Sequence, residues 1–408
     1  MKKLFILTIL LFINKLEAQT VSFYAGSTGA VSGYLDANGT AARFASPFGL
    51  AKDVTGNIYV ADASNHKIRK IDPNGNVTTV AGTTGGYLDG NISVAKFNTP
   101  SGIAVDAIGN IYVADTNNHK IRKIDINGNV TTIAGSTEGF LNGDGTVARF
   151  NTPFRLAIGA LNSIFVLDRG NSMIRKIDSN NNVTTFAGSF YGYLDGAGST
   201  ARFADPCGIF IDSNLELYIA DRANQKIRKI TVDGTVSTIA NNVSGYGLTK
   251  SIDGNFYIAD GTNNCVRKIN TAGVVSLYAG TENIPSNLAG NFLSPFDIVE
   301  RPNGNLLIAD AGAHNIKMIT QPLNTNNFST VNFKLYPNPT SSQIRLSFEN
   351  NLENANLKIV SLLGQTVLEK QNLSGNNLNF DVSNLAKGMY VITINDGVLV
   401  TNTKFVKE

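Results

Sequence analysis

The chain has 408 residues, of which 42% are hydrophobic and 16% are charged, and its formal net charge is +3. Residues 1–18 contribute +2 of that charge, so the remainder is nearly neutral and offers no electrostatic basis for binding nucleic acid or an anionic membrane. Two cysteines, Cys207 and Cys265, are too few for a disulfide framework or a cysteine-based metal site, and we expect them to be unpaired.

The N-terminal segment has the pattern of a secretory signal peptide. Lys2 and Lys3 precede an apolar run over residues 4–13, and Ala18 supplies a small residue near a cleavage point. The apolar run is too short to span a bilayer comfortably. We therefore predict that residues 1–18 are a signal peptide and that the protein leaves the cytoplasm.

One motif recurs six times and organises the next three hundred residues. Its first copy, at residues 59–71, reads Tyr-Val-Ala-Asp-Ala-Ser-Asn-His-Lys-Ile-Arg-Lys-Ile. Each copy is anchored by an aspartate, and these are Asp62, Asp115, Asp168, Asp221, Asp260 and Asp310. Their separations of 53, 53, 53, 39 and 50 residues indicate a repeat architecture.

Each repeat is expected to form four short strands. In the first repeat the predicted strands are 48–52, 57–61, 67–71 and 77–81. The second strand is apolar at successive positions, so both faces of its sheet must be covered, as in a blade stacked between two other blades. Between the third and fourth strands, Asn74-Gly75 favours a two-residue hairpin.

The pattern of fourth strands predicts how the repeats close into a ring. A fourth-strand motif follows each of the first five copies and begins at Val77, Val130, Val183, Val236 and Val275. The sixth copy has no such strand after it, whereas a matching strand at residues 21–26 stands alone near the N-terminus. We predict an all-β, six-bladed β-propeller over residues 19–320, in which this N-terminal strand completes the last blade.

Residues 62–69 read Asp-x-x-Asn-His-x-Ile-Arg, and the same pattern recurs at residues 115–122. In both copies Gly-Asn-Ile-Tyr-Val precedes it. This motif resembles the NHL repeat, and the resemblance covers residues 21–320. It implies a propeller, but it does not imply one activity, because NHL-type propellers include both binding platforms and enzymes.

A different unit follows the repeats. Residues 321–333 form a polar, Asn-rich linker, and residues 334–408 contain alternating apolar positions that predict short half-buried strands. This second segment contains Leu335-Tyr-Pro-Asn-Pro-Thr340 and ends with Lys404-Phe-Val-Lys-Glu408. It resembles the type A C-terminal sorting domain of the type IX secretion system. The resemblance implies a small β-sandwich that engages this secretion machinery and directs export from the periplasm across the outer membrane, followed by release or attachment to the cell surface.

The sequence predicts no catalytic residue, metal ligand or cofactor. His66, His119 and His314 occupy the same repeat position on separate sheets, about 10 Å or more apart. Zinc needs ligand nitrogens about 2.0–2.1 Å from the ion, so these histidines cannot share one metal, and we expect them to have polar roles in turns. The recurring pairs such as Asp62 and Arg69 are expected to be a turn cap and a paired charge at blade interfaces.

The candidate ligand site consists of departures from the repeat. One position of the first strand is glycine in four blades, but it is Arg155 in the third and Asp297 in the sixth, next to Phe154 and Phe296. The first strand of a blade is the innermost, and the third and sixth blades lie opposite each other. We therefore expect the two charges to face across the central channel and to bind a polar ligand, with the phenylalanines packing its apolar part. The alternative is that each charge has a local partner or points to water.

The predicted function is that of a binding module, secreted or displayed on the outer cell surface, for an unidentified protein, glycan or small-molecule ligand. The alternative is a propeller hydrolase or lyase of the lactonase or streptogramin-lyase kind. Such an enzyme would need acidic, asparagine or histidine groups that converge at one mouth of the channel. We expect a monomer without a transmembrane segment or a nucleic-acid partner.

Overall fold

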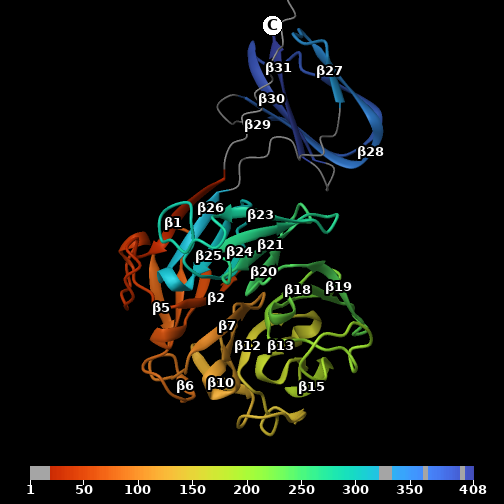
Figure 1. Cartoon of the computed structure of the whole chain (residues 1–408). Helices are drawn as coiled ribbons and strands as arrows, with labels where there is room; N and C mark the ends of the chain where they lie inside the picture. Colours follow the sequence, from red (N-terminus) through yellow and green to blue (C-terminus); the bar gives the residue numbers. More distant parts are fainter. Residues whose placement is uncertain (1–18, 321–332, 362–365, 396–399) are drawn as a thin grey trace, which may run out of the picture. The chain divides into compact units, whose positions relative to one another are not determined.

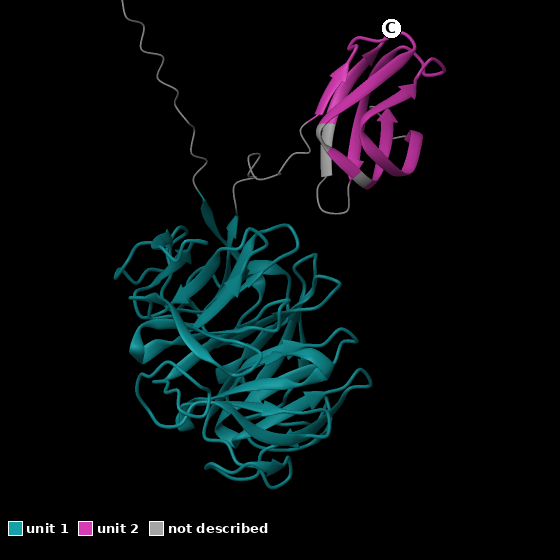
Figure 2. Cartoon of the chain, turned by 90° about the vertical axis from the view of Figure 1, so that its right-hand side faces the viewer, with its two compact units in different colours: residues 1–322 teal, residues 323–408 magenta. Residues whose placement is uncertain are grey.

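The computed structural model (Figure 1) describes residues 19–320, 333–361, 366–395 and 400–408. The chain divides into two compact units, residues 1–322 and residues 323–408 (Figure 2). The predicted signal peptide, and the predicted linker except for Phe333, lie outside the described residues.

The first unit is a propeller of six antiparallel sheets. Blade 1 contains β2 (Pro47–Lys52), β3 (Ile58–Asp62), β4 (Lys67–Ile71) and β5 (Val77–Ala81). Blade 2 contains β7 (Pro100–Val105), β8 (Ile111–Asp115), β9 (Lys120–Ile124) and β10 (Asn129–Ala134), with β6 (Gly90–Asn91) at its outer edge. Blade 3 contains β12 (Pro153–Ile158), β13 (Ile164–Asp168), β14 (Met173–Ile177) and β15 (Asn182–Ala187), with β11 (Gly143–Asp144) at its outer edge.

The other three blades repeat this plan. Blade 4 contains β16 (Pro206–Ile211), β17 (Leu217–Asp221), β18 (Lys226–Ile230) and β19 (Val236–Asn241). Blade 5 contains β20 (Gly247–Lys250), β21 (Phe256–Asp260), β22 (Cys265–Ile269) and β23 (Val275–Gly280). Blade 6 contains β24 (Pro295–Glu300), β25 (Leu306–Asp310), β26 (Asn315–Thr320) and β1 (Thr20–Gly26).

The first strand of each blade lies nearest the ring axis, because it contacts the first strand of the next blade all the way around. Single-turn 3-10 helices follow the second strand in five blades and are η2 (Ala63–Asn65), η3 (Thr116–Asn118), η5 (Arg169–Asn171), η6 (Arg222–Asn224) and η7 (Ala311–Ala313). The remaining two are η1 (Gly39–Ala41) and η4 (Ala160–Asn162). The start of each first strand lies beside the end of each second strand, for example Pro47 opposite Asp62, so the five helices that follow second strands lie at one end of the ring axis.

The N-terminal strand closes the ring as predicted. β1 pairs antiparallel with β26, with Val21 opposite Ile319 and Phe23 opposite Lys317, so blade 6 takes strands from both ends of the propeller sequence. Figure 1 shows β1 in red directly beside β26 in cyan. Val21 and Ala25 are buried in the apolar clusters on either side of blade 6.

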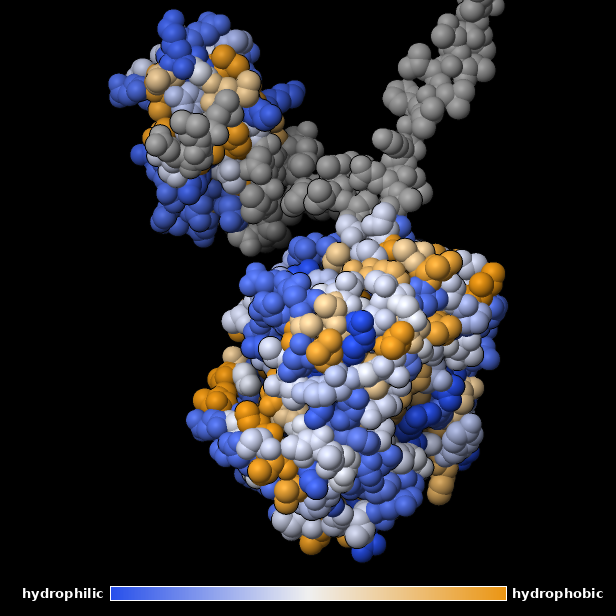
Figure 3. Space-filling view, turned by 90° about the vertical axis from the view of Figure 1, so that its left-hand side faces the viewer, coloured by the Kyte–Doolittle hydropathy of each residue, from blue (hydrophilic) through white to orange (hydrophobic). Residues whose placement is uncertain are grey.

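Apolar clusters fill the spaces between neighbouring blades. The cluster between blades 6 and 1 combines Leu307 and Ile316 with Leu50 and Val60, and equivalent clusters follow around the ring. This arrangement covers both faces of each sheet, which is why the second strands are apolar at successive positions. On the propeller face seen in Figure 3, exposed apolar side chains form small groups separated by polar ones.

One local prediction was wrong. The loop between β4 and β5 is not a two-residue hairpin with two left-handed residues, because only Gly75 has a positive φ, of 85°. The Asp72 carboxylate accepts hydrogen bonds from the backbone nitrogens of Asn74 and Asn76, each at 2.9 Å. This capping, with Pro73 at the first loop position, stabilises a longer turn that ends in a left-handed glycine.

The second unit is one folded sheet of five strands. These are β27 (Phe333–Tyr336), β28 (Gln343–Ser361), β29 (Thr366–Asp381), β30 (Gly388–Asn395) and β31 (Val400–Lys407). The first half of β28 pairs with β27 and its second half with β30, while β29 pairs along both halves. Because residues of both halves, such as Leu346 and Ile359, share one apolar cluster, the sheet folds over into a small sandwich.

The two cysteines of the propeller, Cys207 and Cys265, are both buried free thiols, as expected. Within the described residues, no helix has the length and apolar character needed to cross a membrane.

Ring closure by β1 leads to a stability prediction. Replacing the buried Val21 by Asp should lower the free energy of unfolding by about 2–4 kcal/mol, because an unpaired carboxylate would enter the apolar cluster beside blade 6. Thr20→Asp is the matched control, because Thr20 is exposed on the same strand. Deleting residues 20–26 should destabilise the propeller further. Equal denaturation midpoints for Val21→Asp and Thr20→Asp would contradict the assigned role of β1.

Candidate functional site

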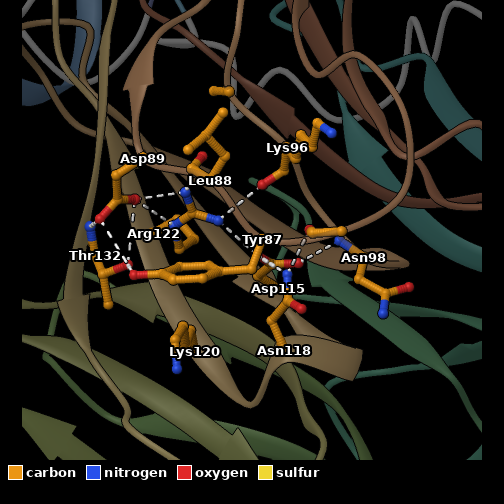
Figure 4. A network of polar contacts seen from close by, with 12 residues as sticks. Tyr87, Leu88, Asp89, Lys96, Asn98, Asp115, Asn118, Lys120, Arg122 and Thr132 are labelled. Carbon is orange, nitrogen blue, oxygen red and sulfur yellow. Dashed lines mark hydrogen bonds and ion pairs between the residues drawn. The ribbon is translucent and has the colours of Figure 1, made fainter.

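In blades 1–4 the repeated Asp–Arg pair joins the blade to the connection that precedes it, as Figure 4 shows for blade 2. In blade 2 the buried Asp115 carboxylate accepts hydrogen bonds from the Asn98 backbone nitrogen at 2.7 Å and from the Arg122 guanidinium at 2.7 Å. Arg122 also donates to the Leu88 carbonyl at 2.9 Å and forms an ion pair with Asp89 at 2.5 Å. Both partners of the central pair are fully buried, so the motif holds the fold together within a blade and its connection rather than at a blade interface.

The three histidines link neighbouring blades. Each lies in a left-handed conformation after a 3-10 turn, and its Nδ1 accepts a hydrogen bond from a backbone nitrogen of the next blade's connection. The three bonds are Thr99 to His66 at 3.1 Å, Thr152 to His119 at 3.2 Å and Ser46 to His314 at 3.0 Å. Burial lowers the pKa of His66 and of His314, which favours the neutral imidazole that can accept this bond.

Glycine in the innermost strands is required by the close approach of neighbouring blades. A Cβ atom added to Gly102 would lie 2.6 Å from the carbonyl oxygen of Phe154 on the next blade. One added to Gly208 would lie 2.8 Å from a methyl group of Leu248. The equivalent Gly49 and Gly247 are similarly confined, so four blades leave no space for a side chain at this position.

The two exceptions meet at the ring axis. The Arg155 guanidinium of blade 3 contacts the Asp297 carboxylate of blade 6 at 2.5 Å. Arg155 also donates to the carbonyl oxygens of Phe48 at 2.9 Å and Phe296 at 2.8 Å, while Asp297 accepts from the Leu50 nitrogen at 2.8 Å. The charges therefore touch each other and leave no room for a ligand directly between them.

Burial acts on both members of this pair. It raises the pKa of the Asp297 carboxyl and lowers that of the Arg155 guanidinium, while the attraction between the two opposite charges acts against both shifts. Arg155 Nε is buried without a hydrogen-bond partner in the described structure. The pair joins blades 1, 3 and 6 across the axis.

Aromatic side chains lie beside this pair, where the first strands begin. Phe296 stacks on Tyr246, with ring centroids 4.2 Å apart, and on Phe48 at 4.6 Å. Phe48 also approaches Phe154 at 6.3 Å. Phe154 is buried, whereas the other three are partly exposed, so these residues supply an apolar surface at the mouth of the ring.

A second charged group completes the mouth and was missed in the sequence. Asp205 accepts hydrogen bonds from both Arg169 and Arg222, and Arg222 donates to the Tyr246 hydroxyl at 3.1 Å. The Arg169 guanidinium lies 4.7 Å from the Phe154 ring centroid. Burial raises the pKa of Asp205, but the two arginines outweigh this effect and hold it below its ordinary value.

Arg169, Arg222 and Asp205 depart from the repeat, which is the same signal that identified Arg155 in the sequence. The residue directly after the anchoring aspartate is small in the other four blades, where it is Ala63, Thr116, Gly261 or Ala311. The residue before the first-strand proline is otherwise Ser46, Thr99, Thr152 or Ser294. All three differ in size or charge from the residues at the same repeat positions in the other blades.

A buried thiol lies next to the second charged group. The Cys207 thiol lies beneath Asp205, with its sulfur 3.7 Å from a carboxylate oxygen, and burial raises its pKa to about 12. The thiol is therefore held in its neutral form. Among the described residues, no group of three or more His, Cys, Asp or Glu side chains could hold a metal ion.

Comparison with known families agrees with both predicted resemblances. Residues 334–408 match the family described as the secretion system C-terminal sorting domain. Residues 86–189 match the Teneurin NHL domain. NHL repeat-containing protein 2 from Bos taurus is 35% identical over 136 residues, which are 28% of this chain and 19% of that protein. The chain spans less than a third of the length of the first curated relatives that it matches.

Solved structures share the propeller fold. A structural genomics protein of unknown function from Bacteroides thetaiotaomicron has a TM-score of 0.56 and 20% identity, over 74% of this chain and 76% of that one. A gluconolactonase from Xanthomonas campestris has a TM-score of 0.51 and 12% identity, over 69% of this chain and 88% of that one. At these identities the likeness concerns the fold alone.

The histidine bonds between blades lead to a pH prediction. The pKa of His66 and His314 is lower in the folded protein than in the unfolded chain, so their contribution is present above about pH 6.5 and is lost as the pH falls through the folded pKa. We expect the free energy of unfolding to fall between pH 7.5 and 5.5. A variant with His66→Asn and His314→Asn should lose less stability over this range, because Asn264 occupies the same position in blade 5. An identical pH dependence of the two proteins in urea denaturation would contradict the role of these histidines.

Proposed function

We propose that this NHL-repeat propeller, which carries a type IX sorting domain, is a binding module that is secreted or displayed on the outer cell surface. The ligand would bind at the mouth of the ring, over the partly exposed Phe48 and Phe296, with the buried Phe154 packed beside Phe48 and the Arg155–Asp297 pair forming the floor. The ligand-binding role of these residues is a prediction of the same proposal.

The proposal rests on one observation: the residues that depart from the repeat gather at one end of the ring axis. The repeated aspartates, arginines and histidines are used within the fold, as the Asp115 and His66 contacts illustrate. The residues that break the repeat, among them Arg155, Asp297 and Arg222, instead meet around one end of the axis beside partly exposed aromatic rings. Aromatic side chains together with a few placed polar and charged groups are typical of the lining of a ligand site.

The sorting domain supports the proposed location. Residues 334–408 match a family of sorting domains and form an apolar core of their own, separate from the propeller clusters. Export would use this unit, while ligand binding would use the propeller. The mature protein would therefore reach the outside of the cell by way of the periplasm.

Export can be tested by deleting residues 334–408 in a host that has a type IX secretion system. We expect the truncated propeller to fold but to remain in the periplasm, because the signal that the secretion machinery recognises is absent. Cell fractionation and protease protection report its location. As a matched control, residues 334–408 fused behind a periplasmic reporter should carry that reporter to the surface or the medium. Normal surface delivery of the truncated protein would contradict the proposal.

Ligand binding can be tested with the double variant Arg155→Gly and Asp297→Gly. Glycine occupies this position in the other four blades, and removing both charges leaves neither one buried alone. Ligands would first be identified by screening the immobilised protein against panels of glycans, peptides and small metabolites. We expect the variant to bind the identified ligand at least about tenfold more weakly, because the floor of the mouth is lost. Unchanged affinity would contradict the assignment of the mouth.

A further inference from the structure

The mouth of the ring divides into an apolar half and a cationic half. Contacts run around it from Arg222 through Tyr246, Phe296 and Phe48 to Phe154, and return through Arg169 and Asp205 to Arg222. The aromatic residues come from blades 1, 3, 5 and 6, and the second charged group comes from the ends of blades 3 and 4. A ligand at this mouth therefore meets two different chemical surfaces side by side.

The cationic half has one positive charge in excess. Arg169 and Arg222 share the single carboxylate of Asp205, whereas Arg155 and Asp297 neutralise each other on the floor. In the described structure, Asp205 accepts from Arg169 only at Nε, and the two terminal nitrogens of Arg169 have no hydrogen-bond partner. The Arg169 side chain is 31% exposed and that of Arg222 is 27% exposed, so a ligand can reach them.

The repeat does not require an arginine at this position. Alanine occupies the same position in blades 1 and 6, and threonine and glycine occupy it in blades 2 and 5. In blades 3 and 4, however, an arginine occupies this position, and its guanidinium group lies against an aromatic ring at the mouth. A guanidinium with a free edge binds a carboxylate through two parallel hydrogen bonds.

We propose that the mouth binds a small monoanionic carboxylate whose acidic group is joined to an apolar ring. The carboxylate would pair with the free edge of Arg169 next to Arg222, and the ring would pack on Tyr246 and Phe48, which are partly exposed. One negative charge balances the single excess positive charge of the mouth. This inference rests on the proposed binding function and adds the chemical class of the ligand.

The test is a ligand-observed NMR titration of the purified full chain with phenylacetate, phenylacetamide and acetate. The amide keeps the ring and removes the charge, and acetate keeps the charge and removes the ring. We expect phenylacetate to bind about tenfold more tightly than phenylacetamide, because its hydrogen bonds are made to a charged partner, and also more tightly than acetate. Equal binding of phenylacetate and phenylacetamide would overturn the proposal.

Two variants assign the effect to the arginines. The triple variant Arg169→Ala, Asp205→Thr, Arg222→Ala carries residue types found at these positions in other blades and leaves no unpaired charge. It should bind phenylacetate no better than phenylacetamide. Asp205→Thr alone should bind phenylacetate more tightly than the wild type, because a competing carboxylate has been removed. Arg202→Ala, which changes an exposed arginine on the connection before β16, is the matched control and should leave the affinity unchanged.

The outcomes separate this inference from the proposed function. If the triple variant still prefers phenylacetate, or if Asp205→Thr weakens its binding, the arginines are not the carboxylate site. If the protein captures a neutral ligand from the screening panels but not phenylacetate, the carboxylate assignment is wrong and the binding module stands. If it captures neither, both proposals fail.

Discussion

The close approach of the innermost strands at the ring axis is the constraint on which the rest of the propeller depends. At one repeat position near the start of these strands, a Cβ atom on Gly102 would lie 2.6 Å from the Phe154 carbonyl of the next blade. Four blades meet this constraint with glycine. The other two, in blades 3 and 6, direct an arginine and an aspartate to the axis, where they pair and bind backbone groups of blade 1. A desolvated pair of this kind is tolerated only because each charge finds its partner.

The repeat and its exceptions have different tasks. In blades 1–4, buried Asp–Arg pairs fix the preceding connection to its blade, and in three blades a histidine Nδ1 atom receives a hydrogen bond from the connection of the next blade. Such contacts recur around the ring, because its joints are similar. A ligand site needs only one copy, so it can form where a blade departs from the pattern. Arg155, Asp297, Arg169, Asp205 and Arg222 are such departures, and all five lie around one mouth.

Much of the fold could be predicted from the sequence, because six copies of the repeat showed the same pattern of strands and turns. The predicted first strand of blade 1 began at Phe48, and the observed strand begins at Pro47. Ring closure by β1 was predicted because a fourth-strand motif stood alone near the N-terminus while the sixth repeat lacked one. The hairpin after β4 was predicted incorrectly because Asp72 and Pro73 shape the turn as well as the Asn-Gly pair. That Arg155 and Asp297 would touch could not be predicted, since the width of the ring depends on how all six sheets tilt. Arg169 and Asp205 were missed because loop geometry brings them together, although both depart from the repeat.

The Arg155–Asp297 pair joins opposite blades across the axis, and a double-mutant cycle tests this interaction most directly. The free energy of unfolding would be measured for the wild type, Arg155→Gly, Asp297→Gly and the double variant. Each single change should cost about 3–5 kcal/mol, because it leaves a buried charge without its partner, and the double variant should be less destabilised than the sum by at least about 2 kcal/mol. Additive effects of the two substitutions would show that the side chains do not interact and would contradict the account.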